Sequence, residues 1–205
     1  MSRRDAGFTL IELLVAVTLL GVIVLALGNA VIGYVRTNDA TTDRLLLSHD
    51  AQLASAYFAE DVAAVGLRDY ATSGTPFLPS IQENAAYDAG EVICGTATTP
   101  VSVVRFLSDD WDGTASPPVR RTDVVAYYVK ASGSVRELHR LRCAGAVTSD
   151  VTVAHYIDPT ITVVATCSSA CGGTAVPQTV TLTFTVTRPH ADPYPIVLSG
   201  HRRQT

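Results

Sequence analysis

Residues 8–35 read FTLIELLVAVTLLGVIVLALGNAVIGYV, and Glu12 is the only charged residue among them. The first part of this stretch, Phe8–Leu27, has 20 residues. A helix of that length is about 30 Å long, which is the thickness of the hydrocarbon core of a bilayer. A helix that is apolar on every side must lie in lipid or inside a protein assembly. The stretch therefore predicts a helix that can span a membrane.

The helical pattern continues beyond the apolar stretch. No proline occurs before Pro76, and apolar residues recur every three or four positions, which is the spacing of one helix face. We expect one helix from about Phe8 to Val65, apolar all round over 8–35 and amphipathic over 36–66, with Gly28 and Gly33 softening it midway. The predicted buried face consists of Leu47, Ala51, Ala54, Phe58, Val62 and Val65, whereas Asp50, Gln52, Glu60 and Asp61 are expected mostly off this face.

The remainder, 67–205, predicts a β-rich globular head. Gly66–Glu91 contains glycine and proline breakers and is expected to be a loop, and Ala131–Ser134 is expected to be a hairpin turn. For Asp150–Ile157 a strand and a short helical turn both stay open. Strands are expected at Val101–Leu107, Asp123–Lys130, Val135–Cys143, Ile161–Cys167, Thr179–Thr187 and Pro195–Arg202. A long N-terminal helix packed on an antiparallel β-sheet meander is an α+β fold.

The bulk composition excludes some classes of function. The chain has 205 residues and a formal net charge of −4. Nucleic-acid binding is not expected, because it requires a clustered basic face. The histidines have no ligand spacing, and the sequence has no G-x-S-x-G, H-E-x-x-H or glycine-rich phosphate loop. We therefore expect neither an enzyme nor a bound metal or cofactor.

Glu12 stands out because of where it lies. A carboxylate inside a membrane-spanning helix costs about 2.5–3.5 kcal/mol at the helix centre and less near an interface, so such a charge is retained only with a partner. No basic residue follows before Arg36. The partner must be another chain, a lipid head group, or a new chain terminus made by proteolysis.

Residues 7–27, GFTLIELLVAVTLLGVIVLAL, which follow the short charged start of the leader MSRRDAG (1–7), resemble the class III signal of type IV prepilins and type II secretion pseudopilins. The resemblance implies that prepilin peptidase cleaves between Gly7 and Phe8 and methylates the new N-terminus of Phe8. It also implies that Glu12 pairs with the α-amine of a neighbouring subunit during assembly. This pairing supplies the partner that the energetic argument requires.

The same resemblance implies a location and a set of partners. The chain would wait in the cytoplasmic membrane as a single-pass protein with its head outside, and Arg3 and Arg4 on the cytoplasmic side agree with the positive-inside rule. It would then enter a cell-surface or periplasmic filament. The expected partners are prepilin peptidase, other pilin or pseudopilin subunits, the inner-membrane assembly platform and, before assembly, membrane lipid.

Two other interpretations of the N-terminus stay open. Glu12 could be a tolerated polar residue of a plain membrane anchor that snorkels to water. A secretory signal cut after Ala30 would need an apolar region about half as long as this one and a better small-residue cleavage site. Neither explains the Gly7–Phe8 junction or the short charged leader.

Parts of the head resemble particular subclasses. Segments around Val124–Val129, Leu138–Arg140, Thr181–Phe184 and Leu198–Arg202 are similar to W-type minor pilins, which the resemblance places at a filament tip or in assembly initiation. The same segments are similar to J-type pseudopilins of type II secretion, which is the alternative function. Retention of Glu12 argues against the tip pseudopilins that lack this glutamate. A second alternative is an exported, membrane-tethered binding domain that never enters a filament.

Two further groups of residues are candidate sites in the head. An exported chain with Cys94, Cys143, Cys167 and Cys171 is expected to form disulfides, and of three possible pairings we favour Cys94–Cys143 with Cys167–Cys171 over a zinc site. The run from Asp109 to Asp112 is either a solvated acidic turn, which we favour, or a calcium site. It lacks the later glutamate of an EF-hand loop.

Overall fold

The computed structural model describes residues 9–66, 68, 78–173, 175–189 and 191–203. One long helix, α1 (Leu10–Ala63), precedes eight strands and a short 3₁₀ turn at Ala89–Glu91. The chain forms two compact units, Met1–Asp43 and Arg44–Thr205. The helix contributes to both units, and each is described separately below. We call the second unit the head.

Helix α1 ends at Ala63, two residues before the predicted end at Val65, and begins at Leu10, the second described residue. It has 54 residues, and neither Gly28 nor Gly33 interrupts it. Phe8, where the predicted helix begins, lies outside the described residues. At the other end Val65 donates to the carbonyl of Val62 in a final tighter turn before Gly66. The expected softening at the two glycines does not produce a break in the helix.

In the first unit the helix is exposed on every side. Its described apolar side chains include Leu10 with 84% of its surface exposed, Leu20 with 61% and Leu25 with 71%. An 18-residue window of this helix reaches a mean hydropathy of 2.9 with 0% of the window buried. By length and composition the segment is therefore able to cross a membrane, as the sequence predicts.

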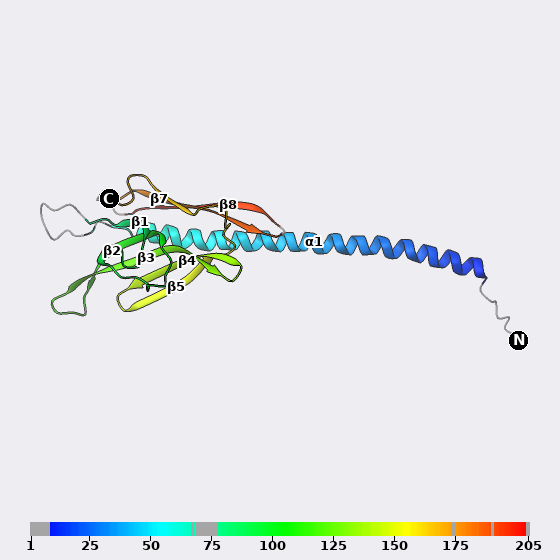
Figure 1. Ribbon diagram of the computed structural model, residues 1–205, viewed down its shortest axis with the longest axis horizontal. Helices are drawn as coiled ribbons and strands as arrows, with labels where there is room; N and C mark the ends of the chain where they lie inside the picture. Colours follow the sequence, from blue (N-terminus) through cyan, green and yellow to red (C-terminus); the bar gives the residue numbers. More distant parts are fainter. Residues whose placement is uncertain (1–8, 67, 69–77, 174, 190, 204–205) are drawn as a thin grey trace. The chain divides into compact units, whose positions relative to one another are not determined.

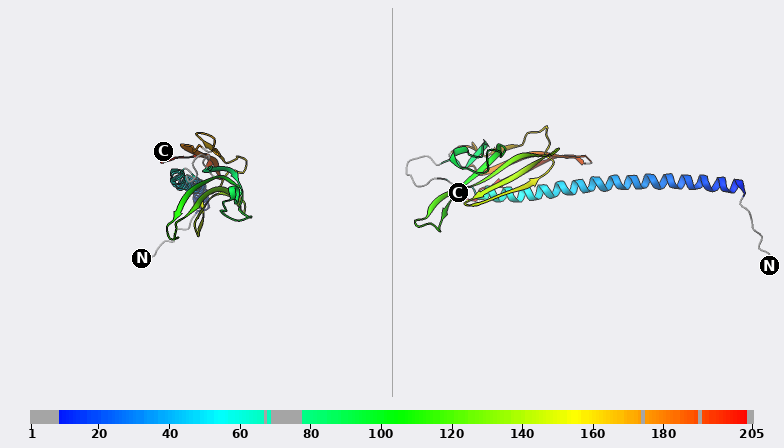
Figure 2. Two further views of the ribbon diagram at one scale, coloured as in Figure 1. Left: turned by 90° about the vertical axis from the view of Figure 1, so that its left-hand side faces the viewer. Right: turned by 60° about the horizontal axis from the view of Figure 1, so that its bottom comes forward.

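The head contains two antiparallel sheets, where the sequence predicted one meander. The five-stranded sheet has the order β1-β2-β3-β4-β5 and the three-stranded sheet the order β6-β7-β8. Figures 1 and 2 show them on different sides of the helical segment that starts at Arg44. The strands are β1 (Ile81–Ala85), β2 (Ser102–Asp112), β3 (Val119–Ser132), β4 (Val135–Ala144), β5 (Val147–Ala154), β6 (Val164–Cys167), β7 (Thr179–Arg188) and β8 (Ala191–His201).

Two strands, β1 and β5, were not among the six predicted strands, while β2, β3 and β8 are longer than predicted and β6 is shorter. Strand β1 lies within the segment that was expected to be a loop, and β5 resolves the open choice at Asp150–Ile157 in favour of a strand that begins earlier, at Val147. Strand β1 has only five residues and lies at the edge of its sheet. So short a segment shows too little alternation of apolar and polar residues to predict a strand. The β3–β4 turn was predicted correctly: Ser132 pairs with Val135, and Gly133 has a φ of +61°.

The core of the head forms around the predicted helix face. Phe58 is fully buried and makes edge-on contacts with the rings of Phe106 and Tyr127, at centroid distances of 5.7 Å and 5.4 Å. The three-stranded sheet closes the other side, and a Cβ added at Gly200 would lie 2.4 Å from the Cβ of Val62. Glycine at this point of β8 lets the strand approach the helix. Of the predicted face, Leu47, Ala54, Phe58, Val62 and Val65 are buried and Ala51 is partly buried.

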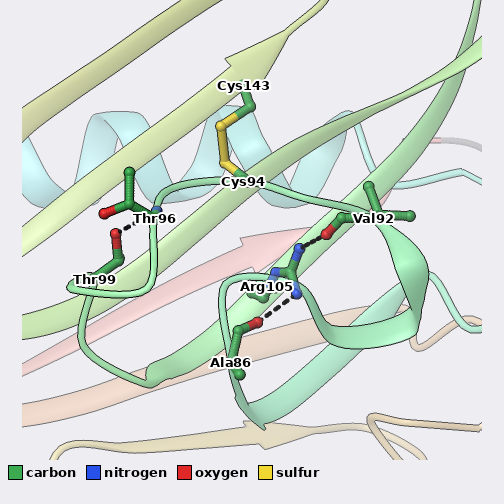
Figure 3. Close-up of a disulfide and its surroundings, with 7 residues drawn as sticks. All are labelled: Ala86, Val92, Cys94, Thr96, Thr99, Arg105 and Cys143. Carbon is green, nitrogen blue, oxygen red and sulfur yellow. Dashed lines mark hydrogen bonds between the residues drawn. A yellow bond between two sulfur atoms is a disulfide. The ribbon is translucent and has the colours of Figure 1, made fainter.

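A smaller cluster covers the opposite face of the five-stranded sheet. The segment that leads from η1 (Ala89–Glu91) into β2 is held there by the Cys94–Cys143 disulfide (Figure 3). The buried Arg105 donates to the carbonyls of Ala86 and Val92, each at 2.7 Å. Burial lowers the pKa of Arg105 from its ordinary value, and the nearby Asp88 carboxylate partly offsets this. The segment is thus anchored from both sides.

The second disulfide joins Cys167 to Cys171. These are the two pairings that the sequence favoured, and no cysteine of the described residues is free. On the chain-entropy account, a bridge that closes about 50 residues stabilises the fold by about 4 kcal/mol, and one that closes about five residues by about half of that. The Cys94–Cys143 bridge is therefore the stronger restraint.

Candidate functional site

The described chain begins at a helix cap made by Thr9. The backbone N–H of Glu12 points to the carbonyl of Thr9 at 3.1 Å and to its Oγ1 at 3.4 Å, and the N–H of Leu13 donates to the same carbonyl at 3.2 Å. Threonine followed three residues later by glutamate is the spacing of a capping box. The carbonyl and hydroxyl oxygens of Thr9 therefore cap the first turn of α1.

The carboxylate of Glu12 lies on the surface of this first turn. The residue is exposed, and within the described part of the chain no basic side chain is placed against it. A negative charge is favoured in the first turn of a helix because the backbone N–H groups there carry partial positive charge. That interaction is modest, about 0.3–1 kcal/mol, and is smaller than the cost of bringing the charge into lipid.

Two threonine hydroxyls in and just after the apolar segment bond to the backbone of their own helix. The hydroxyl of Thr18 donates to the carbonyl of Val15 at 2.9 Å, and that of Thr37 to the carbonyl of Gly33 at 3.0 Å. Such bonds let a threonine enter lipid at little cost, because no donor is left without a partner. Glu12 differs from them, because it carries a full charge, which is costly in lipid, whereas the threonine hydroxyls are neutral.

The proposed cleavage site cannot be described in the same detail. Gly7 and Phe8 both lie outside the described residues, and so do Arg3 and Arg4 of the leader. Their roles as cleavage junction and methylation site therefore stay predictions. What the structure places is the residue just after them, Thr9, and the helix that this residue caps.

Comparison with known proteins bears on the same segment. The prokaryotic N-terminal methylation motif matches residues 2–28. A search of curated proteins and a search of solved structures gave no match. The chain thus carries a prepilin-type cleavage and methylation motif, which implies processing by prepilin peptidase. Together with the exposed apolar helix, the motif indicates a membrane-anchored, exported protein of pilin-like architecture.

A buried ionic group in the head was missed by the sequence analysis. Asp61 was expected off the buried face, but it is buried and accepts hydrogen bonds from the hydroxyl of Tyr127 at 2.6 Å and from the guanidinium of Arg140. Arg140 also lies over the ring of Tyr57, 4.8 Å from its centroid. The group ties the helix to β3 and β4.

Burial and the contacts with Asp61 shift the pKa of both partners of this carboxylate. Burial, with the Asp61 carboxylate as the next cause, raises the pKa of Tyr127 far above its ordinary value. The hydrogen bond from Arg140 to Asp61 raises the pKa of the guanidinium. The sequence did carry a signal, because Asp61 is three residues after Phe58 and four before Val65 and so shares their face.

The acidic run from Asp109 to Asp112 is the end of strand β2, so the prediction of an acidic turn was wrong. The Asp109 side chain is only 3% exposed and its carboxylate contacts Arg68 at 3.2 Å. Asp110 accepts from Arg121 at 2.7 Å. Asp112 accepts from the backbone and hydroxyl of Thr114, and these bonds lower its pKa. The three carboxylates therefore serve strand and turn contacts.

Histidine and carboxylate groups elsewhere in the head form structural contacts. His139 lies between Asp150, at 3.0 Å, and Glu137, at 3.3 Å, with its ring stacked on Tyr128. The hydroxyl of Tyr128 donates to Asp150 at 2.7 Å. The two carboxylates face opposite edges of the imidazole ring, so they cannot share one ion with it. In the described residues no group of three or more such side chains could hold a metal.

Proposed function

We propose that the protein is a minor pilin-like subunit of a type IV pilus. It is exported as a prepilin, cleaved after Gly7, methylated at Phe8 and assembled through its N-terminal helix. The observation that carries this proposal is one exposed carboxylate, Glu12, in the first turn of an otherwise apolar exposed helix that also bears the methylation motif. Such a charge requires a partner from outside its own helix.

The proposed parts of the chain divide this work. Residues 1–7 are the leader, 8–35 the membrane and filament-core half of the helix, 36–66 the amphipathic half, and 67–205 the head. After cleavage the α-amine of Phe8 in one subunit pairs with Glu12 of another. A charge-assisted pair in an apolar filament core favours subunits in the correct register over others.

The head supports a specialised role over that of a bulk subunit. It has two sheets around one helical segment and two disulfides, and its segments resemble those of W-type minor pilins. We therefore assign it to the tip of the filament or to assembly initiation. The J-type pseudopilin is the alternative with the same N-terminus, and deletion of the chain separates the two: loss of surface pili supports the minor pilin, and loss of protein secretion supports the pseudopilin.

The first experiment is the mass of the mature protein purified from its own membrane. Cleavage and methylation give a chain that starts at Phe8 and carries one additional methyl group. A chain that still begins at Met1, or one that begins near Val31, would contradict the proposal, because the first is an uncleaved anchor and the second a secretory product.

The second experiment is Glu12→Ala. Processing should continue, because the cleavage junction is intact, while incorporation into filaments falls. Glu60→Ala is the matched control, since Glu60 is an exposed carboxylate on the same helix but within the head. Unchanged incorporation of the Glu12→Ala chain would show that the carboxylate has no pairing role.

A further inference from the structure

A groove that the proposed function does not use runs between α1 and β8, which lie side by side in the head (Figure 1). It consists of two hollows of about 540 Å³ and 360 Å³, which share Ser48 of the helix and Tyr194 of the strand. All of its lining residues belong to the second compact unit, Arg44–Thr205. The groove follows the helix for about 18 Å, over Arg44–Ala56, and the strand for about 20 Å, over Asp192–Leu198. These lengths fit a strand of about six residues.

Strand β8 has one open edge. It is the last strand of its sheet in the described part of the chain, with β7 on its other side. The backbone N–H and carbonyl groups of a strand point alternately to its two sides. Arg202 donates to the carbonyl of Gln178 at 2.9 Å on the β7 side, so the even-numbered residues of β8 face β7. The backbone groups of Val197 and Ser199 therefore point to the open edge, where an added strand can bond to them.

The open edge of β8 faces the helix. The N–H of Arg203, which points to the same side as those of Val197 and Ser199, donates to the carbonyl of Ala63 at the end of α1, at 3.5 Å. Close to this point Gly200 brings the strand against the helix. Strand and helix thus meet at Gly200, and the groove that begins at Leu198 leaves space beside the open edge.

Two prolines limit what can pair with this edge. Pro193 and Pro195 occupy odd-numbered positions, so neither removes a donor from the ladder with β7, and each offers only a carbonyl to the open side. Val197 and Ser199 offer both backbone groups. A second copy of β8 is the poorer occupant, because in a two-fold pairing that covers Tyr194–Leu198 the nitrogen of Pro195 in each copy faces a carbonyl to which it cannot donate.

The walls of the groove are uncharged over most of its length. The larger hollow is lined by Tyr194–Leu198 and by five helix residues, Ser48, Ala51, Gln52, Ser55 and Ala56. Arg44 and Asp192, which have opposite charges, line only the smaller hollow. Beside the groove, Val197 has 62% and Tyr194 50% of its surface exposed, which is apolar surface for cross-strand contacts. An uncharged segment therefore matches the groove, whereas a charged side chain would lose water there without gaining an ionic partner.

We propose that this groove binds an extended, uncharged segment of another protein chain, which adds to β8 as a fourth strand of the three-stranded sheet. The backbone groups of Val197 and Ser199 supply the hydrogen bonds. The uncharged walls select small and apolar side chains, which is how strand addition to a sheet edge obtains its specificity. Under the proposed function the segment belongs to a neighbouring subunit, and only this origin rests on that function.

The test uses the full chain in dodecyl maltoside micelles, with backbone amide hydrogen exchange measured by NMR. The probe is the capped peptide acetyl-Thr-Val-Ser-Val-Thr-Val-Ser-amide. At saturation it should slow exchange of the Val197 and Ser199 amides by at least about tenfold, because both N–H groups become hydrogen-bonded. The amide of Leu198, which already faces β7, should keep its rate. The same peptide with every backbone nitrogen methylated should give no protection, and one with glutamate in place of both serines should bind at least about tenfold more weakly.

Two variants of the groove test the same contacts from the side of the protein. Val197→Pro removes one donor of the open edge, at a position equivalent to that of Pro195, and should weaken peptide binding by about tenfold, the value of one hydrogen bond. Ser55→Glu places a charge in the wall of the groove and should also weaken binding by about tenfold. This second variant keeps the test valid if Val197→Pro fails to fold. Leu46→Glu, on the same helix and outside the groove lining, is the control and should bind as the native chain does.

Three results would overturn the proposal. Unchanged exchange at Val197 and Ser199 in the presence of the peptide would remove the site. Equal protection by the methylated peptide would show that no strand pairing takes place. Protection of the same two amides that rises with protein concentration, without any peptide, would make a second copy of the chain the occupant. None of these outcomes depends on cleavage at Gly7, so the mass measurement of the mature chain tests the proposed function separately.

Discussion

The two segments of α1, Leu10–Asp43 and Arg44–Ala63, belong to one helix, but their side chains have different surroundings. In Leu10–Asp43 the large apolar side chains are exposed. The least exposed of them is Val15, which has 47% of its surface exposed. In Arg44–Ala63 one stripe is buried, and Ala54 and Phe58 have no exposed surface. An α-helix satisfies its backbone hydrogen bonds locally, so its formation does not reveal which solvent its side chains require. The side chains carry that information: one segment suits lipid or a subunit core, and the other suits its own head.

The two unusual carboxylates on the helix make the same contrast. Asp61 is enclosed and has its partners within the head, Tyr127 and Arg140. Glu12 is exposed and has no basic partner in the described part of the chain. A buried charge whose partners come from its own fold contributes to the integrity of that fold. Under the proposed function, the exposed carboxylate of Glu12 contributes to assembly instead, because its partner comes from another subunit.

The largest expected effect comes from removing an apolar side chain in each of the two helix segments. Phe58→Ala should lower the free energy of unfolding of the head by about 3–5 kcal/mol, because a fully buried ring is replaced by a cavity. Leu20→Ala, in the first segment, should change it by less than about 0.5 kcal/mol. Urea unfolding of the full chain in detergent, followed by near-ultraviolet circular dichroism, measures both. A large effect of Leu20→Ala on the head would show that the two segments are not independent.

The carboxylates give the next comparison. Asp61→Ala should destabilise the head by about 3 kcal/mol or more, because it leaves the Arg140 charge and the Tyr127 hydroxyl buried without their partner. Glu12→Ala should leave head unfolding unchanged and affect only filament incorporation. The same urea titrations, together with a filament assay, separate the two effects. If Asp61→Ala is neutral, the buried group has no stabilising role.

A smaller effect is expected from the glycines. Gly200→Ala should cost about 1–3 kcal/mol, since the new methyl group would meet Val62 at the contact between β8 and the helix. Gly21→Ala in the first segment adds a methyl group with no atom within 4 Å, and should have no effect on the head. Thermal unfolding suffices to compare them. Partial recovery of stability in Gly200→Ala with Val62→Ala would identify the clash as the cause.

The smallest effect is a pH dependence. The pKa of Tyr127 is raised in the folded head, chiefly by burial, above the ordinary value of 10.0. Above about pH 10 the unfolded chain loses this proton while the folded chain keeps it, so stability falls as pH rises, by up to about 1.4 kcal/mol per pH unit. Tyr127→Phe should reduce the slope between pH 9 and pH 11.

Much of the fold follows from periodicity in the sequence. The helix, its buried stripe, the β3–β4 turn and the position of six strands depend on local spacing and on turn residues, so they were predictable. The favoured cysteine pairing is also the one in the structure. Strand β1 and the division into two sheets were not predicted, and β5 was left open between a strand and a helical turn, because strand pairing depends on partners that are distant in the sequence.

The polar sites of the molecule also differ in how far the sequence predicts them. Glu12 and its surroundings could be identified from the sequence because a single charge in a long apolar run is visible without any structure. The buried group of Asp61, Tyr127 and Arg140 joins residues up to 79 positions apart, and it has no sequence motif.

The sequence by itself determined the membrane-competent helix and its prepilin-type motif, because hydrophobicity, length and the position of one charge are local properties. Only the tertiary structure decided which carboxylate would be enclosed and which strand edge would face the helix. The physical reason is that burial and electrostatic pairing depend on distances through space, and these distances are set when two sheets close around one helical segment.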